Sequence, residues 1–77
     1  MQETGIGRIV LFNVGEGEGD RPMIITRVWS DTCVNGRVIL DGINDSHVYF
    51  GMKIGTDAHV TSVMRGKNVG EWRFYDD

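Results

Sequence analysis

The chain has 77 residues, a formal net charge of −3 and a single cysteine, Cys33. This length fits one domain, residues 1–77, and so short a chain buries only about 60% of the surface that its unfolded form exposes. One cysteine excludes an internal disulfide and a multi-cysteine zinc site, so we expect a homo-oligomer, in which further copies supply the missing buried area.

The charge balance and the ends of the chain limit the possible partners and locations. Duplex DNA is not an expected partner, because DNA-binding domains carry a basic surplus. No apolar run approaches the ~20 residues of a membrane-spanning helix. Residues 1–5 lack the basic and apolar regions of a signal peptide, so we expect a cytoplasmic protein.

The first half of the chain contains three β-prone segments. Residues 7–14 form the first, which ends in a loop rich in glycine and glutamate at residues 15–20. Residues 23–29 are a continuous apolar run that is typical of a central strand. Pro22 stands at the start of that strand, where a missing N–H does least harm.

The third segment, residues 34–40, alternates between apolar and polar positions. A strand places successive side chains on opposite faces of its sheet. The predicted inward-facing residues are Val34, Val38 and Leu40. The predicted outward-facing residues are Asn35, Arg37 and Ile39.

The second half predicts further short strands. Val48, Phe50, Met52 and Ile54 share a period of two, which favours one strand through this stretch. Two more strands are expected at residues 59–64 and 71–75. Many short strands at close intervals predict an all-β fold, a small SH3-like barrel of five or six strands. An OB-like barrel usually needs a longer chain.

No set of residues predicts catalysis, a metal site or a cofactor. The glycine-rich loop carries acidic residues that would repel a phosphate, and no helix follows it. Asp41, Asn44, Asp45 and His47 could offer metal ligands, but turns favour the same residue types and no calcium-loop spacing is present. Cys33 with His59 could form a nucleophile and base, yet no catalytic signature surrounds them.

Cationic, aromatic and polar residues gather on the predicted strands. Arginine binds phosphate through paired hydrogen bonds, and an aromatic face stacks on a nucleobase. The residues with this chemistry are Arg27, Trp29, Asn35, Arg37, Thr61, Ser62 and Arg65. Taken alone, large aromatic residues favour the core of so small a domain, by a narrow margin for Trp29 and more clearly for Trp72 and Phe74. Tyr75 is expected to be exposed.

The run Arg-Val-Trp-Ser-Asp-Thr-Cys-Val-Asn at residues 27–35 resembles a family of very small proteins of tailed phages and prophages. The order of the later motifs is similar too: Asp41-Gly42, Asn44-Asp45, Thr61-Ser62-Val63 and Trp72. The chain departs from the pattern at Gly36, where an apolar residue is usual. It departs again at Arg73-Phe74, which replace a His-Trp pair, and it lacks a proline-rich tail.

The resemblance implies a phage protein, and small phage proteins often disarm the host or decorate the virion. We expect a non-enzymatic immune-evasion protein that sequesters a nucleotide signal, of the cyclic oligonucleotide or cyclic ADP-ribose type, in a pocket between subunits. In that function, Arg27, Arg37 and Arg65 would bind phosphates and Trp29 would stack on a base. The alternative is a protein-binding module, either a virion cement protein or an inhibitor of a host defence protein. Single-stranded nucleic-acid binding ranks third and an enzyme last.

Overall fold

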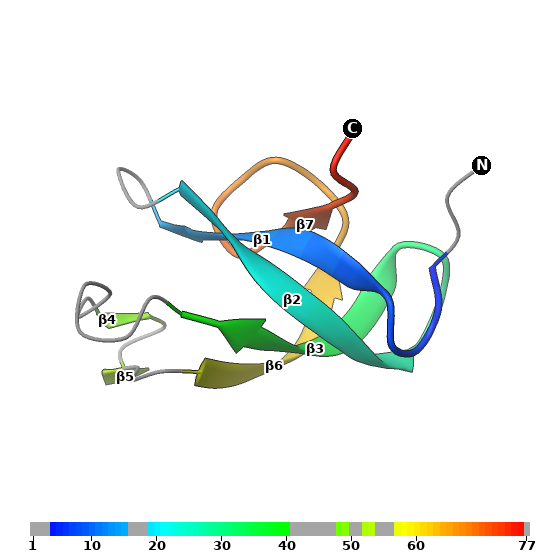
Figure 1. Ribbon diagram of the computed structural model, residues 1–77, viewed down its shortest axis with the longest axis horizontal. Helices are drawn as coiled ribbons and strands as arrows, with labels where there is room; N and C mark the ends of the chain where they lie inside the picture. Colours follow the sequence, from blue (N-terminus) through cyan, green and yellow to red (C-terminus); the bar gives the residue numbers. More distant parts are fainter. Residues whose placement is uncertain (1–3, 16–18, 41–47, 50–51, 54–56, 77) are drawn as a thin grey trace.

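The computed structural model describes residues 4–15, 19–40, 48–49, 52–53 and 57–76, and it is all-β, as predicted (Figure 1). Its strands are β1 (Ile9–Gly15), β2 (Gly19–Val28), β3 (Cys33–Ile39), β4 (Val48–Tyr49), β5 (Met52–Lys53), β6 (Asp57–Met64) and β7 (Trp72–Arg73). Within these residues there is no helix that could cross a membrane.

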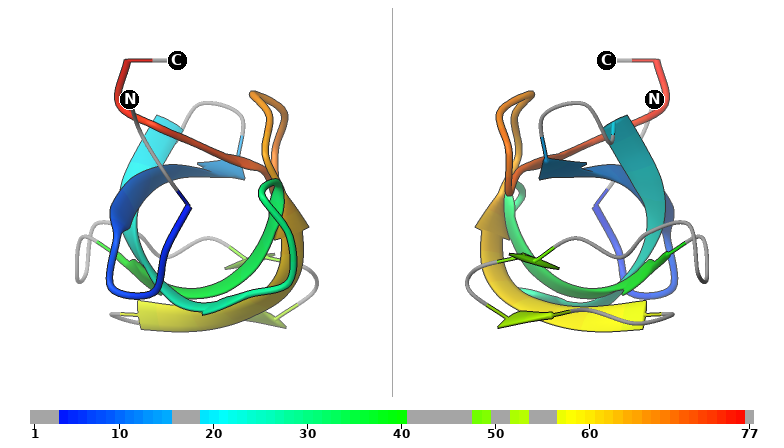
Figure 2. Two further views of the ribbon diagram at one scale, coloured as in Figure 1. Left: turned by 90° about the vertical axis from the view of Figure 1, so that its right-hand side faces the viewer. Right: turned by 90° about the vertical axis from the view of Figure 1, so that its left-hand side faces the viewer.

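Five strands form one antiparallel sheet in the order β6-β3-β2-β1-β7. Strands β1, β2 and β3 pair in turn as hairpins, β6 pairs with β3, and the last strand, β7, returns beside β1. Figure 2 shows the sheet curling until its two ends approach each other. There Arg65, just after β6, forms a single parallel bridge with Trp72 of β7, and the Gly66 N–H donates to the Trp72 carbonyl at 2.8 Å. The sheet is therefore a curled half-barrel whose two edges meet where Arg65 and Gly66 contact Trp72.

The stretch through residues 48–54 differs from the prediction of one strand. The chain reverses, so that Val48 pairs with Lys53 and Tyr49 with Met52 in a separate two-stranded sheet. The period of two was therefore a misleading signal for residues 48–53, and Phe50 and Ile54, which share it, lie outside the described residues.

Strand β2 begins at Gly19, four residues before its predicted start. Pro22 therefore lies inside the strand, opposite Leu11 of β1. The pairing of β2 with β3 begins only at Met23. The missing N–H of Pro22 thus precedes the β3 ladder, which explains how a proline fits within a central strand.

The alternation of side chains between the two faces of the sheet determines which residues form the core. Val34, Val38 and Leu40 are buried, while Arg37 and Ile39 are exposed and Asn35 is half-buried, as predicted. The other buried apolar residues are Val10, Phe12, Val14, Met23, Ile25, Val60, Val63, Trp72 and Phe74.

Two aromatic residues of the final segment anchor this core, as the sequence favoured. Trp72 has no exposed surface, and its Nε1–H donates to the Val63 carbonyl at 3.2 Å. The Phe74 ring meets the Trp72 ring edge to face, with centroids 5.3 Å apart. The indole thus joins the edges of the half-barrel through both packing and a hydrogen bond.

At Gly36 the backbone of β3 lies close to the buried side chain of Met23. A Cβ atom there would lie 2.6 Å from Cγ and Sδ of Met23 and 3.0 Å from the Ile24 carbonyl oxygen. Both distances are shorter than van der Waals contact. The space that a larger side chain would need at position 36 is therefore occupied by the Met23 side chain.

Candidate functional site

Trp29 lies where β2 turns into β3, and its ring is more than half exposed, at 53%. The turn is closed by backbone hydrogen bonds from the N–H groups of Trp29 and Ser30 to the Cys33 carbonyl. The indole Nε1–H donates to Oδ1 of Asn35 at 2.9 Å. Trp29 is therefore a surface residue whose ring is held by the next strand, which settles the choice between core and surface that the sequence left open.

The amide of Asn35 is the centre of the site. Its Oδ1 accepts a second hydrogen bond, from the backbone N–H of Ser62 on β6, at 2.8 Å. One carboxamide thus joins three strands: the indole at the end of β2, its own strand β3, and the backbone of β6. Strand β3 lies between the other two in the sheet, so Asn35 reaches both neighbours.

Two irregularities in strand pairing create this geometry. Between β3 and β6, Val34 pairs with Val63 but Gly36 pairs with Val60, so both Thr61 and Ser62 lie opposite Asn35. This is the pattern of a β-bulge, and Ser62 has a φ of 51°, in the left-handed region. Such a conformation costs a non-glycine residue of order 1–3 kcal/mol and is found preferentially at functional sites. The hydrogen bond to Asn35 helps to offset that cost.

Arg27 completes the group. A second register shift, between Ile25 and Arg27, leaves Thr26 as an extra residue in β2 and sets Arg27 opposite Asn35. The Arg27 guanidinium carbon lies 4.2 Å from the Trp29 ring centroid. This distance is well within the ~6 Å range of a cation–π contact. Arg27, Trp29, Asn35 and Ser62, called here the Trp29 cluster, are thus joined by direct contacts.

The other three residues predicted for the site lie around it at different distances. Thr61 is exposed within the same bulge as Ser62. Arg37 is exposed two residues after Asn35 on the same face of β3, roughly 6–7 Å along the strand. Arg65 stacks on the Phe74 ring, 4.7 Å from its centroid, at the seam where the sheet edges meet.

The seam carries a contact that the sequence did not suggest. Arg8 lies 5.5 Å from the centroid of the Phe74 ring that Arg65 also contacts. Two cations packed on one buried ring give Arg8 and Arg65 a structural role. The sequence signal was weak, because Arg8 and Phe74 lie at opposite ends of the chain.

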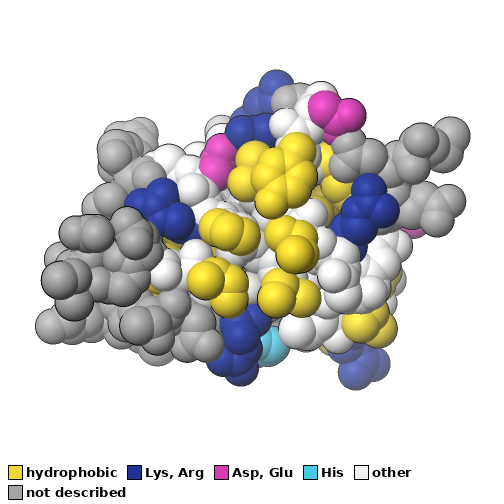
Figure 3. Space-filling view, viewed as in Figure 1, with side chains coloured by type: hydrophobic (Ala, Val, Ile, Leu, Met, Phe, Trp, Pro, Cys, Tyr) yellow, Lys and Arg dark blue, Asp and Glu magenta, His cyan; other side chains and the backbone are white. Residues whose placement is uncertain are grey.

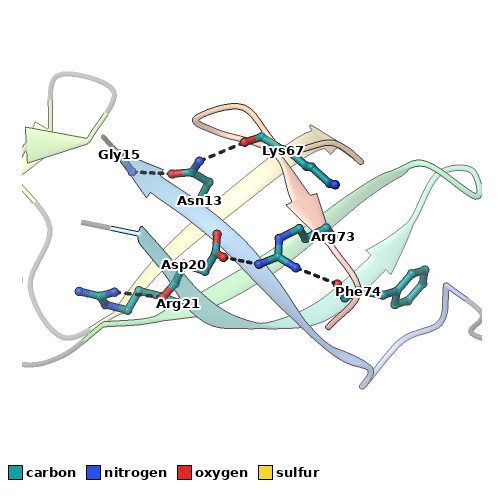
Figure 4. Close-up of polar contacts among 7 residues, drawn as sticks. All are labelled: Asn13, Gly15, Asp20, Arg21, Lys67, Arg73 and Phe74. Atoms are coloured by element: carbon teal, nitrogen blue, oxygen red, sulfur yellow. Dashed lines mark hydrogen bonds and ion pairs between the residues drawn. The ribbon is translucent and has the colours of Figure 1, made fainter. Parts of the chain in front are cut away.

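An ion pair on the outer face of the sheet was also missed. Nη2 of Arg73 lies 2.6 Å from Oδ2 of Asp20, and both side chains are about three-quarters buried (Figure 4). The sequence places Asp20 in the loop at residues 15–20, whereas in the structure it belongs to β2. The pair fixes β7 against the β1–β2 hairpin, in which β7 has a ladder of backbone pairs with β1 and none with β2 among the described residues.

The catalytic combination of Cys33 and His59 gains no geometric support. Cys33 pairs with Met64 and His59 with Arg37, which separates Cys33 from His59 by roughly 13 Å along the strands, beyond hydrogen-bond reach. In the part of the chain that the structure describes, no three His, Cys, Asp or Glu side chains are grouped to hold a metal. Asp41, Asn44, Asp45 and His47 lie outside the described residues.

The Trp29 cluster presents a fixed aromatic ring beside the guanidinium of Arg27 and the bulged backbone at Ser62. These groups recognise planar rings and anions. No protein-family model, curated protein or solved structure matches this chain.

Proposed function

We propose that the protein binds a nucleotide-like small molecule on the Trp29 cluster and sequesters it without changing it chemically. The supporting observation is the state of the Trp29 ring, which is 53% exposed and yet held by both Asn35 and Arg27. An exposed ring that is already ordered can stack on a base with little further loss of side-chain entropy. Such stacking is worth ~1–3 kcal/mol for each base.

Each polar group of the cluster has a matching part in a nucleotide. Arg27 and Arg37 supply guanidinium groups for phosphate oxygens. Asn35 uses its carbonyl oxygen within the protein, and its amide nitrogen supplies two donors for a base edge or a ribose hydroxyl. The hydroxyls of Thr61 and Ser62 add further partners. Because Arg65 packs on Phe74 at the seam, we leave it out of the site.

We infer the biological context from the resemblance of residues 27–35 to small phage proteins. A phage protein that holds a nucleotide without transforming it would intercept a defence signal of the host, either a cyclic oligonucleotide or a cyclic ADP-ribose isomer. Binding in a pocket between subunits of a homo-oligomer would enclose more of the ligand than one small domain can.

We also infer that residues 1–77 form one SH3-like barrel. This is supported by the strand order β6-β3-β2-β1-β7, in which the last short strand lies beside the first. The bridge between Arg65 and Trp72, where the two edges approach, supports it as well. Small barrels of this kind carry many unrelated functions, so the fold class by itself does not choose the ligand.

Native mass spectrometry of the protein with a panel of cyclic di- and trinucleotides and cyclic ADP-ribose isomers tests the proposal. We expect one ligand to be retained at fixed stoichiometry and Trp29→Ala to weaken its binding at least roughly tenfold. Tyr75→Ala is the matched control, because it removes another exposed ring, 59% exposed, outside the cluster.

Two results would contradict parts of this proposal. If Trp29→Ala and Arg27→Ala both fold and bind as tightly as the wild type, the site is wrong. If the wild type retains no member of the panel, the function is wrong, and a protein partner in the virion or the host becomes the better proposal.

A further inference from the structure

The outer face of β1 and β2 carries four apolar side chains, Ile9, Leu11, Pro22 and Ile24, called here the apolar quartet. Ile9 pairs with Ile24 and Leu11 with Pro22 across the two strands, so the four form two adjacent rows. Ile9 is 49% exposed and Ile24 36% exposed. Figure 3 shows hydrophobic side chains gathered over β1 and β2, with Lys and Arg side chains around them. Exposed apolar patches of a few hundred Å² often mark interaction sites.

Charged residues of opposite sign lie at the two ends of this face. Along β2 the outward positions are Asp20, Pro22 and Ile24, followed after the bulge by Arg27. Strand β2 therefore presents an acid, two apolar residues and a base in that order. A rotation of β2 by 180° about the midpoint between Pro22 and Ile24 exchanges the positions of these two residues. The same rotation exchanges the position of Asp20 with that of Arg27.

We propose that this face binds a second copy of the same chain, with β2 of one subunit crossing antiparallel over β2 of its partner. A two-fold axis perpendicular to the strands, midway between Pro22 and Ile24, sets Ile24 against the partner subunit's Pro22. The same axis sets Arg27 against the partner subunit's Asp20, and symmetry makes each contact twice. The interface is isologous, the commonest arrangement of homodimers, and the two sheets pack face to face with aligned strands.

Charge and size favour a second copy as the occupant. The order of charges along β2 is self-complementary, so a single kind of contact, Arg27 against the partner subunit's Asp20, is made at both ends of the face although Asp20 already pairs with Arg73. Aliphatic side chains at the centre do not provide the aromatic platform that single-stranded nucleic acid uses. A curled sheet with cross-sectional extents of 21 × 18 Å offers limited flat area. We therefore expect an interface below the ~800 Å² per partner of standard complexes and a dissociation constant in the micromolar range.

The dimer bears on the Trp29 cluster, since Arg27 belongs to both. Asp20 is already paired with Arg73 in its own subunit. When Arg27 meets that pair across the interface, two cations flank one carboxylate and the group keeps a net positive charge. The edge of the interface beside Trp29 would thus offer an anion more cationic charge than one subunit alone. In this respect the inference rests on the proposed function, whereas self-association itself is measured without any nucleotide.

Sedimentation velocity of the full chain between about 1 and 500 µM tests the self-association, a range that brackets a micromolar dissociation constant. We expect a monomer–dimer equilibrium for the wild type and at least a tenfold weaker dimer for Ile24→Lys. Met64→Lys is the matched control, because Met64 is an exposed apolar residue, 48% exposed, on β6. Circular dichroism of each variant checks that it folds.

A mixing experiment tests the antiparallel crossing specifically. Asp20→Arg and Arg27→Asp should each weaken their own homodimer at least tenfold, because each brings like charges together twice. An equimolar mixture of the two variants should form a heterodimer at least tenfold tighter than either variant's homodimer, since opposite charges then face each other at both ends of the interface. If the mixture stays monomeric while the wild type dimerises, the crossing is wrong.

The remaining outcomes test whether the outer face of β1 and β2 is the dimer interface. A wild type that stays monomeric at about 500 µM overturns the proposal, and so does a dimer that Ile24→Lys leaves intact. Loss of the dimer in Met64→Lys as well as in Ile24→Lys would overturn it too. Nucleotide retention by a monomeric Ile24→Lys variant would contradict only the pocket between subunits, leaving the Trp29 cluster as a site.

Discussion

Replacing Asn35 by alanine tests the geometry of the Trp29 cluster directly. The change removes the single oxygen that accepts from Trp29 Nε1 and from the Ser62 N–H. A hydrogen bond contributes ~0.5–1.5 kcal/mol net, and both bonds lie in an exposed part of the sheet. We therefore expect a loss of about 1–2 kcal/mol, which lowers the melting temperature of a domain this small by about 5–15 °C. The left-handed Ser62 loses the contact that offsets its strain.

The assay is thermal unfolding followed by circular dichroism, together with the Trp29 indole N–H resonance in NMR spectra. Asn35→Asp should stay close to the wild type, because a carboxylate accepts both bonds. Asn68→Ala, the same chemical change at an exposed turn position, is the control and should have little effect. The reasoning is refuted if Asn35→Ala melts within about 1 °C of the wild type and leaves the indole resonance in place.

Three further changes probe the core and the outer face, each by urea or thermal denaturation. Gly36→Ala should destabilise the protein by about 1–3 kcal/mol through overpacking against Met23, whereas Gly5→Ala, with open space around it, should change stability by no more than about 0.5 kcal/mol; equal effects would contradict the close approach. Trp72→Phe should cost about 2–3 kcal/mol, since it leaves a cavity and deprives a buried carbonyl of its donor, and a loss below about 1 kcal/mol would be inconsistent with the burial. A double-mutant cycle of Asp20→Ala and Arg73→Ala should give a coupling of about 0.5–1 kcal/mol that falls with added salt, and a coupling of zero would show that the pair does not form in solution.

The sequence predicts most strands correctly because their signals are local. Period-two alternation gave the inward and outward faces of β3 residue by residue, and glycine-rich punctuation gave most strand boundaries. The prediction of one strand through residues 48–53, where the structure has two, was wrong because it also relied on a local signal. The alternation of apolar residues continues through a stretch in which Val48 pairs back with Lys53, and periodicity alone cannot show such a reversal.

The site was only partly predictable, because its geometry depends on pairing between strands. Arg27, Trp29, Asn35 and Ser62 were all chosen for their chemistry, and the structure joins them. Nothing in the sequence shows the two bulges that align them, since a bulge is a property of the register between strands. The stacking of Arg65 on Phe74 could not be foreseen either, because it depends on how the curled sheet brings its edges together.

Asn35 and Gly36 are adjacent residues of β3, so they connect the core directly to the proposed site. On the inner side of the sheet, Gly36 makes room for the Met23 side chain, so β2 and β3 approach closely at that position. On the outer side, Asn35 holds the indole from β2 and the bulge of β6. The two register shifts flank this same pair of residues, between Ile25 and Arg27 on β2 and opposite Asn35 on β6. A larger residue at position 36 would push β2 away and lengthen the Trp29–Asn35 bond, so changes at a buried glycine should alter ligand binding without touching the ligand.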